Sequence, residues 1–191
     1  MKTRICRSLL LFGALFAARS PLRAQSQALT IDPAQTKVEF TLGSVLHTVH
    51  GNFQLKRGTL RFDPQSGAAS GELIVDAASG ESGNDSRDKR MHASILESAK
   101  FPEITFRPDR VDGKVAPEGK SQVQLHGIFA IHGAEHEIML PVTVDATGGR
   151  YNATATFQVP YVKWGMKNPS TLLLRVNDKA EITIQTVARP M

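Results

Sequence analysis

From residue 37 onward, apolar and polar residues alternate along most of the chain. In the first run, Val38, Phe40 and Leu42 are separated by polar residues. A period of two is typical of β-strands that bury one face. Comparable runs lie near residues 49–55, 60–62, 73–75, 104–106, 123–131, 138–144, 153–159, 172–176 and 182–184. Short turns such as 133–134 and 148–149 separate them, so the pattern predicts an all-β fold, an antiparallel barrel or sandwich of about eight strands.

One segment departs from this alternation and predicts a short helix over residues 84–98. Asn84 or Asp85 can cap its N-terminus, and acidic residues lie in its first turn. Met91 and Ile95 are four residues apart and therefore share one face of a helix. Because the helix interrupts a continuous series of strands, we expect it to cover an opening of the barrel or its side.

The first 24 residues are expected to be a signal peptide that is removed on export. The segment begins with a basic stretch, residues 2–7. The apolar stretch that follows, residues 8–18, is shorter than the roughly 20 apolar residues of a membrane-spanning helix. Ala24, or alternatively Ala18, ends a plausible cleavage site. We therefore expect a periplasmic or secreted protein whose residues 25–191 form a single domain.

Removal of this segment changes what the charge and the cysteine content imply. It holds five of the 23 basic residues and no acidic residue, so the remaining 167 residues contain 18 of each sign. A formally neutral domain does not favour nucleic acid as a partner. The segment also contains Cys6, the only cysteine. The domain is therefore predicted to have no disulfide and no thiolate metal ligand.

The sequence lacks the motifs of several common enzyme classes. It contains no G-x-S-x-G nucleophile motif, no P-loop and no dinucleotide-binding fingerprint. We therefore predict no catalytic residue and no cofactor.

The histidines leave a second hypothesis open, a metal-binding protein or a metal-dependent enzyme on the same barrel. His47, His50, His126, His132 and His136 could supply nitrogen ligands to zinc or copper. However, His47 and His50 would point to opposite faces of a strand. We favour the interpretation that these are polar strand and turn residues, and we predict no metal site.

Two further segments each have two interpretations. The basic stretch from Arg87 to His92 is either a solvated helix face or a polar rim, at which Arg87 or Arg90 meets a ligand headgroup. Trp164, the only tryptophan, either plugs one end of the barrel or lines a ligand channel.

Four strings of residues occur in the order and at the spacing found in a known family. They are His47-Thr48-Val49-His50-Gly51-Asn52-Phe53; the stretch from Ser86-Arg87-Asp88 through Met91-His92 to Phe101-Pro102-Glu103-Ile104-Thr105-Phe106; Gly127-Ile128-Phe129-Ala130-Ile131-His132-Gly133 with the run 138–144; and Trp164-Gly165-Met166 with Ala180-Glu181-Ile182-Thr183-Ile184. On these strings, which cover nearly all of residues 28–188, the chain resembles the YceI family of lipocalin-like, polyisoprenoid-binding proteins.

This resemblance implies an extended antiparallel barrel with a helix beside it and an elongated apolar tunnel inside. It also implies binding of a long isoprenoid-type chain, such as a quinone tail or a polyprenyl lipid, for transport or storage and without chemistry. Ile95 and Leu96 stand where many relatives carry paired aromatic residues, a difference that bears on the bore of the tunnel. Transient membrane contact and a homodimer remain open, as does a solid barrel that holds no ligand.

The residues expected at the site follow from the same resemblance. Seven apolar residues are expected to line the tunnel, namely Phe40, Leu42, Phe53, Leu73, Phe106, Phe129 and Trp164. Arg87 or His92 is expected near the headgroup of the lipid.

Overall fold

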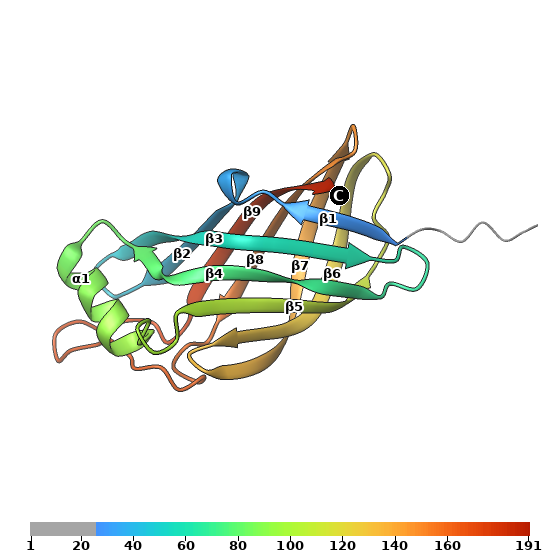
Figure 1. The fold of residues 1–191 in the computed structure, drawn as a ribbon. Helices are drawn as coiled ribbons and strands as arrows, with labels where there is room; N and C mark the ends of the chain where they lie inside the picture. The colour runs from blue at the N-terminus through green and yellow to red at the C-terminus, as the bar shows by residue number, and fades with distance from the viewer. Residues whose placement is uncertain (1–25) are drawn as a thin grey trace, which may run out of the picture.

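The computed structural model describes residues 26–191, which form one closed antiparallel sheet with a short helical segment at one end (Figure 1). The expected all-β barrel is therefore confirmed. The strands are β1 (Gln27–Ile31), β2 (Lys37–Gly43), β3 (Thr48–Phe62), β4 (Ala69–Glu81), β5 (Glu103–Asp112), β6 (Gly119–Ile131), β7 (Ala134–Thr147), β8 (Arg150–Val159) and β9 (Ala180–Pro190).

Nine strands occupy eight positions in this barrel, because β1 and β2 share one position between β3 and β9. The N-terminal β1 pairs with the distal half of β3, where Ile31 lies opposite Gly58. A single 3-10 turn, Pro33–Gln35, interrupts the extended chain, and β2 then pairs with the other half of β3 and with β9. From β3 the strands follow one another in chain order, and pairing of β3 with β4 and of β2 with β9 completes the circuit.

Two strands contain bulges that change which residues face inward. In β3, Leu55 and Gly58 are both buried, whereas Lys56 and Arg57 between them are exposed. The bulge therefore joins the two separate sequence runs 49–55 and 60–62 into one strand of 15 residues. In β5, a similar irregularity between Pro108 and Arg110 leaves Asp109 and Arg110 exposed and returns Val111 to the interior.

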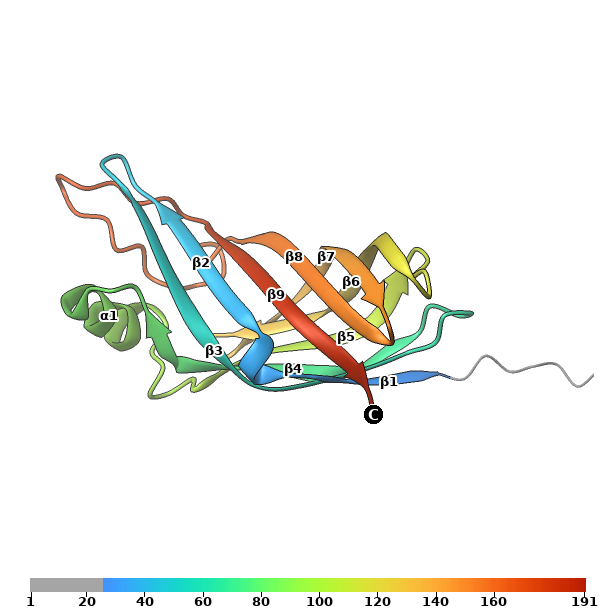
Figure 2. The same ribbon diagram turned by 90° about the horizontal axis from the view of Figure 1, so that it is seen from above.

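The helical segment lies where the sequence pattern predicts it. Helix α1 (Asp85–Arg90) is capped by Asn84, whose side-chain oxygen accepts a hydrogen bond from the backbone nitrogen of Arg87 at 3.0 Å. A π-helical turn (Met91–Ile95) continues it, with the nitrogen of Leu96 donating to the carbonyl of Met91 at 2.8 Å. The segment covers one end of the barrel, as Figures 1 and 2 show.

The helical segment is attached where the pairing of β3 and β4 is least regular. Between two paired positions, Asn52 with Glu81 and Gln54 with Asp76, β4 uses five residue steps and β3 only two. The Ser79 hydroxyl in this excursion accepts a hydrogen bond from the backbone nitrogen of Gln54 at 2.8 Å. The regular pairing of β3 and β4 is therefore interrupted at this end, next to the helix.

One predicted strand is wrong. Residues 172–176 form part of a long connection between β8 and β9, in which only Val176 makes an isolated bridge, to Ser44. The reason is a tight turn in which the nitrogen of Thr171 donates to the carbonyl of Leu174 at 2.8 Å. Leu172 and Leu173 occupy the tip of this turn, so the apolar run does not alternate between an inner and an outer face.

Side chains fill the interior at the end opposite the helix. Two clusters of buried residues lie there, one of Leu29, Ile31, Val38, Leu55, Val75 and Ala188, and the other of Phe62, Val111, Val123 and Val144. The barrel is therefore solid in this half.

Within residues 26–191, no helix has the length and apolar character needed to cross a membrane. The expected signal peptide, residues 1–24, lies outside the described residues.

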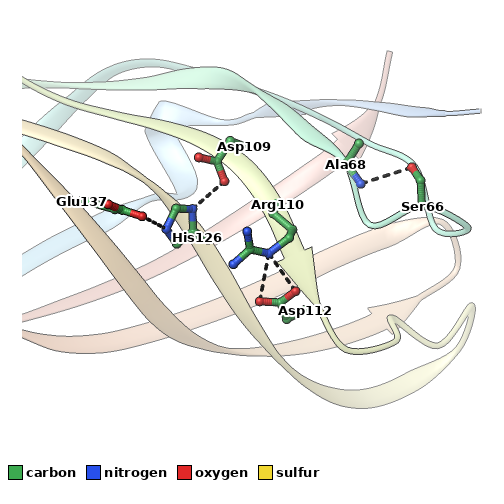
Figure 3. Close-up of polar contacts among 7 residues, drawn as sticks. All are labelled: Ser66, Ala68, Asp109, Arg110, Asp112, His126 and Glu137. Atoms are coloured by element: carbon green, nitrogen blue, oxygen red, sulfur yellow. Dashed lines mark hydrogen bonds and ion pairs between the residues drawn. The ribbon is translucent and has the colours of Figure 1, made fainter.

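A charged cluster on the outer face joins β5, β6 and β7 (Figure 3). His126 contacts Asp109 through its Nδ1 atom at 2.6 Å and Glu137 through its Nε2 atom at 2.8 Å. The hydrogen bond to Asp109, followed by that to Glu137, raises the pKa of His126 above its ordinary value. Since carboxylates only accept hydrogen bonds, both ring nitrogens donate, and the imidazolium is the form that fits this site.

This cluster predicts a pH dependence of stability. The folded state holds the His126 proton more tightly than the unfolded state does, so protonated His126 contributes to the free energy of unfolding. This contribution is complete below the ordinary histidine pKa, about 6.5, and is lost as the pH rises through the raised value. The free energy of unfolding should therefore fall as the pH rises through the raised pKa of His126, and we expect His126→Gln to remove this fall. Denaturant titrations at a series of pH values measure it. A pKa at or below the ordinary value for the His126 ring, measured by NMR, would contradict this assignment.

Candidate functional site

The half of the barrel nearest the helix contains a cavity of about 460 Å³. Its wall consists of inward-facing strand residues, three each from β2 and β9, two each from β3, β6 and β8, and one each from β4 and β5. Those strand residues are Val38, Phe40, Leu42, Val49, Phe53, Val75, Ile104, Phe129, Ile131, Phe157, Val159, Ala180, Ile182 and Ile184. All of them are apolar.

The cavity is elongated. Along β2 and the residue that follows it, the lining extends from Val38 to Ser44, which is six residue steps or about 20 Å of extended chain. At the inner end, Val38 and Val75 belong both to the lining and to the packed cluster that contains Leu55. The cavity therefore ends at the packed half of the barrel, and the alternative that the sequence left open, a barrel filled throughout, does not hold.

The mouth of the cavity is polar. It lies between the β2–β3 hairpin, the helical segment and the β8–β9 connection, which meet at one end of the barrel (Figure 2). Ser44, His47, Ser82, Ser86, Arg87 and Arg90 line it. Polar groups at the rim and apolar groups in the depth give the cavity the character of a site for an amphipathic molecule.

The helical segment forms part of the cavity wall through Met91, Ile95 and Leu96. The first two share a face as the sequence predicts, and the π-helical turn includes both. Neither residue is fully buried, so both side chains remain available to a molecule inside the cavity.

Two glycines allow the aromatic part of the wall to pack closely. A Cβ atom on Gly51 would lie 2.3 Å from the ring of Phe40, and one on Gly80 would lie 2.4 Å from the ring of Phe53. The rings of Phe40 and Phe53 themselves are 5.4 Å apart, in a tilted arrangement. Without these glycines both rings would be displaced.

Five of the nine residues expected at the site line the cavity. Four are apolar: Phe40 and Leu42 on β2, Phe53 on β3 and Phe129 on β6. The fifth, Arg87, lies at the mouth, where its Nε atom donates to the Ser82 hydroxyl and its Nη2 atom donates to the Ser82 carbonyl, both at 2.7 Å.

Leu73 and Phe106 face the interior but lie outside the lining. They are paired across β4 and β5, and Phe106 is buried in the cluster that contains Phe129. The ring of Phe106 lies over Gly127, where a Cβ atom would approach it within 2.9 Å. Both side chains therefore belong to the packed part of the barrel.

His92 holds the helical segment in place and does not line the cavity. Its Nε2 atom is 2.8 Å from the carbonyl of Gly80, which can only accept, so this nitrogen carries a proton. Its Nδ1 atom lies 3.0 Å from the hydroxyl of Ser98. The ring thus connects the π-helical turn to β4 and to the chain that leads into β5.

Trp164 packs beside the cavity as part of its surroundings. Its ring stacks on His136 at a centroid distance of 4.0 Å and an interplanar angle of 6°, and it lies 5.8 Å from the ring of Phe129. Burial lowers the pKa of His136, which favours the neutral ring in this stack. Trp164 therefore does not belong to the lining, in contrast to its place among the residues expected to line the tunnel.

Several lining residues were missed in the sequence because nothing distinguishes them from ordinary core residues. Met166 and Pro169 lie in the irregular β8–β9 connection, where no periodicity indicates the inner face, and Leu174 and Val176 line the cavity from the run that was predicted as a strand. Tyr161 also lines the cavity, and its hydroxyl donates to the carbonyl of Asn177 at 2.6 Å. Burial raises the pKa of Tyr161 to about 12, so this hydroxyl stays neutral.

The histidines do not converge. Within residues 26–191, no group of three or more histidine, cysteine, aspartate or glutamate side chains is arranged to hold a metal ion. His47 lies at the mouth and His50 on β3, while His132 contacts Glu97 at 2.6 Å and His126 belongs to the charged cluster on the outer face. Nothing in this arrangement favours the metal hypothesis.

Known structures share this architecture. The chain is similar to BcnA of Burkholderia cenocepacia, with a TM-score of 0.67 and 19% sequence identity, over 82% of this chain and 98% of that one. It is also similar to a polyisoprenoid-binding domain of Saccharophagus degradans, with a TM-score of 0.68 and 12% identity, over 86% of this chain and 99% of that one. A third similar structure is the YceI protein of Campylobacter jejuni, with a TM-score of 0.59 and 19% identity, over 75% and 85% of the two chains.

Identities this low establish likeness of fold. No curated protein matches the chain. The family model described as the YceI-like domain matches residues 29–188, which include every strand except the first two residues of β1 and the last two of β9. With a closed barrel, a capping helix and a family match over most of its length, the chain belongs to the YceI family.

Proposed function

We propose that this protein binds a long apolar chain of the isoprenoid type in its cavity, for transport or storage, and does not transform it. The observation that carries this proposal is the elongated apolar cavity with a polar mouth. A fold shared with a domain described as polyisoprenoid-binding supports the choice of ligand.

The physical driving force is burial of hydrocarbon. Each methylene group removed from water contributes about 0.8 kcal/mol. About ten such groups would contribute about 8 kcal/mol before the entropy cost of binding, which is enough for useful affinity without a strong charged anchor. A chain longer than the cavity would extend through the mouth.

The mouth supplies the polar part of the site. Arg90 is exposed beside the opening, and Arg87 is fixed there by its two hydrogen bonds to Ser82. Guanidinium groups form strong hydrogen bonds with anionic and carbonyl oxygens. A quinone ring or a phosphorylated lipid headgroup is therefore expected to lie among these residues while its tail occupies the cavity.

Export is the second part of the proposal. The basic and apolar pattern of residues 1–24 supports a signal peptide and a periplasmic or secreted location. We expect N-terminal sequencing of the protein from its native host to begin at Gln25, or at Arg19 if the alternative site is used. Recovery of the chain with its first 18 residues intact, in the cytoplasmic fraction, would contradict export.

The cavity predicts a substitution that blocks lipid binding and a matched control. Ile184 lines the cavity on β9, whereas the next residue, Gln185, is exposed on the outer face. Ile184→Trp places an indole in the cavity. If it displaces about three methylene groups of the ligand, affinity should fall about 50-fold. Gln185→Trp adds the same side chain outside the barrel and should leave affinity unchanged.

The measurement is native mass spectrometry of protein from its host, followed by organic extraction and identification of the released lipid. The expected result is a stoichiometric prenyl lipid or quinone on the unsubstituted protein and on Gln185→Trp, and its loss from Ile184→Trp. A ligand-free mass, with no uptake of added quinones or polyprenols, would leave the fold unaffected and refute the proposed function.

A further inference from the structure

Two neighbouring loops at the mouth of the cavity expose large apolar side chains to solvent. They are the mouth loops, residues 44–47 of the β2–β3 hairpin and residues 167–176 of the β8–β9 connection. Exposed fractions reach 66% for Val45, 74% for Leu46, 105% for Leu172 and 91% for Leu173. In the described part of the chain, the other large apolar residues exposed in this way are Met139 and Met191, which lie away from the mouth.

The mouth loops are fixed to one another. Ser44 pairs with Val176, and the nitrogen of Val45 donates to the carbonyl of Arg175 at 3.1 Å. On the other side of this pair, the nitrogen of Asn177 donates to the carbonyl of Gly43 at 2.9 Å. Figure 2 shows the two segments side by side at the end of the barrel. Their four exposed apolar side chains therefore form one apolar tip.

The second mouth loop holds Leu172 and Leu173 at the exposed tip of a tight turn. Hydrogen bonds in both directions between Thr171 and Leu174 close a tight turn around Leu172 and Leu173. The tip of such a turn ordinarily carries glycine, proline, asparagine, aspartate or serine. Here two leucines occupy it while the third, Leu174, turns inward and lines the cavity. The apolar tip and the apolar cavity are thus adjacent on the same loop.

The charged side chains on the mouth loops themselves are positive. The mouth loops contain Lys167 and Arg175 and no acidic residue, although basic and acidic residues are equal in number over residues 25–191. Arg87 and Arg90 line the facing side of the opening. Apolar side chains that project beyond flanking basic residues are suited to a bilayer with anionic headgroups. The apolar side chains enter the acyl region, and the basic side chains meet the phosphate groups.

We propose that this protein docks on an anionic lipid bilayer through its apolar tip, with the mouth of the cavity turned toward the membrane. A second copy of the chain is a poorer occupant, because a two-fold contact through this tip would bring Lys167 and Arg175 of both copies together. The proposal goes beyond ligand binding. It states where the protein exchanges its ligand, and it lets a hydrocarbon chain pass between bilayer and cavity without entering water.

Vesicle flotation tests the docking. The probes are vesicles of phosphatidylethanolamine and phosphatidylglycerol, and vesicles of phosphatidylcholine alone. The triple substitution Leu46→Ser, Leu172→Ser and Leu173→Ser removes most of the inserted apolar surface and should lower binding to the anionic vesicles at least about tenfold. Met139→Ser, at an exposed apolar position on β7 away from the mouth, is the control and should not alter binding.

A second variant tests the charges. Lys167→Gln with Arg175→Gln should weaken binding to the anionic vesicles and flatten its dependence on salt, while any binding to phosphatidylcholine stays unchanged. Unaltered binding of this variant to anionic vesicles would overturn the electrostatic part, and unaltered binding of the triple variant would overturn the proposal as a whole. A dimer of the unsubstituted protein that the triple variant converts to monomer, without vesicle binding, would assign the tip to a second copy instead.

The two proposals can fail separately. The triple variant leaves every cavity-lining residue in place, so its uptake of added geranylgeraniol in solution, measured by native mass spectrometry, should equal that of the unsubstituted protein. Ile184→Trp should show the reverse, with vesicle binding retained and ligand lost. Vesicle binding that disappears in Ile184→Trp as well would contradict a docking surface separate from the cavity.

Discussion

The closed circuit of backbone hydrogen bonds is the constraint on which the rest of this structure depends. In an open sheet, the edge strands leave a row of backbone groups unpaired, which have to be covered or protected in some other way. Here each of the eight strand positions has two neighbours, with β1 and β2 together filling the position between β3 and β9. The backbone groups are satisfied around the circuit, so the side chains inside do not have to fill the interior completely. A hollow can therefore persist in one half while the other half is packed.

The division between these halves explains the position of the site. At the distal end, inward residues such as Phe62 and Val111 meet across the barrel and fill it. At the other end the strands diverge, β3 and β4 lose regular pairing, and the helical segment covers part of the opening. His92 connects that segment to the sheet through Gly80 and Ser98. The cavity is thus bounded by packing at its floor and by the helical segment near its mouth.

The mouth combines three kinds of surface within a short distance. Apolar wall residues lie inside it, Arg87 and Arg90 lie at its rim, and the exposed leucines of the mouth loops lie beyond. Each is common alone, and singly exposed apolar residues need no explanation. Their combination around one opening creates a surface suited to contact with a partner. A cavity used only for storage would not require such a surface.

How much could be predicted differs between the fold and the site. The period-two pattern is strong because one face of each strand is buried, so the pattern predicted the strands, and the family resemblance then favoured a barrel over a sandwich. The helix followed from Asn84 and from the spacing of Met91 and Ile95. The resemblance identified Phe40, Leu42, Phe53, Arg87 and Phe129 as site residues, and these line the cavity. Their contact with a ligand stays a prediction.

Periodicity states only that a residue faces inward. Whether an inward residue then meets a partner across the barrel or borders a hollow depends on side chains from distant strands. That is why Leu73 and Phe106 lie in the packed interior while Ile182 and Ile184 line the cavity. The run 172–176 was predicted as a strand because leucine and valine alternate in it with other residues, but two hydrogen bonds between Thr171 and Leu174 make it a turn. The sequence thus determined the strands and their inner faces, and tertiary packing alone decided where the barrel is hollow and which leucines remain outside.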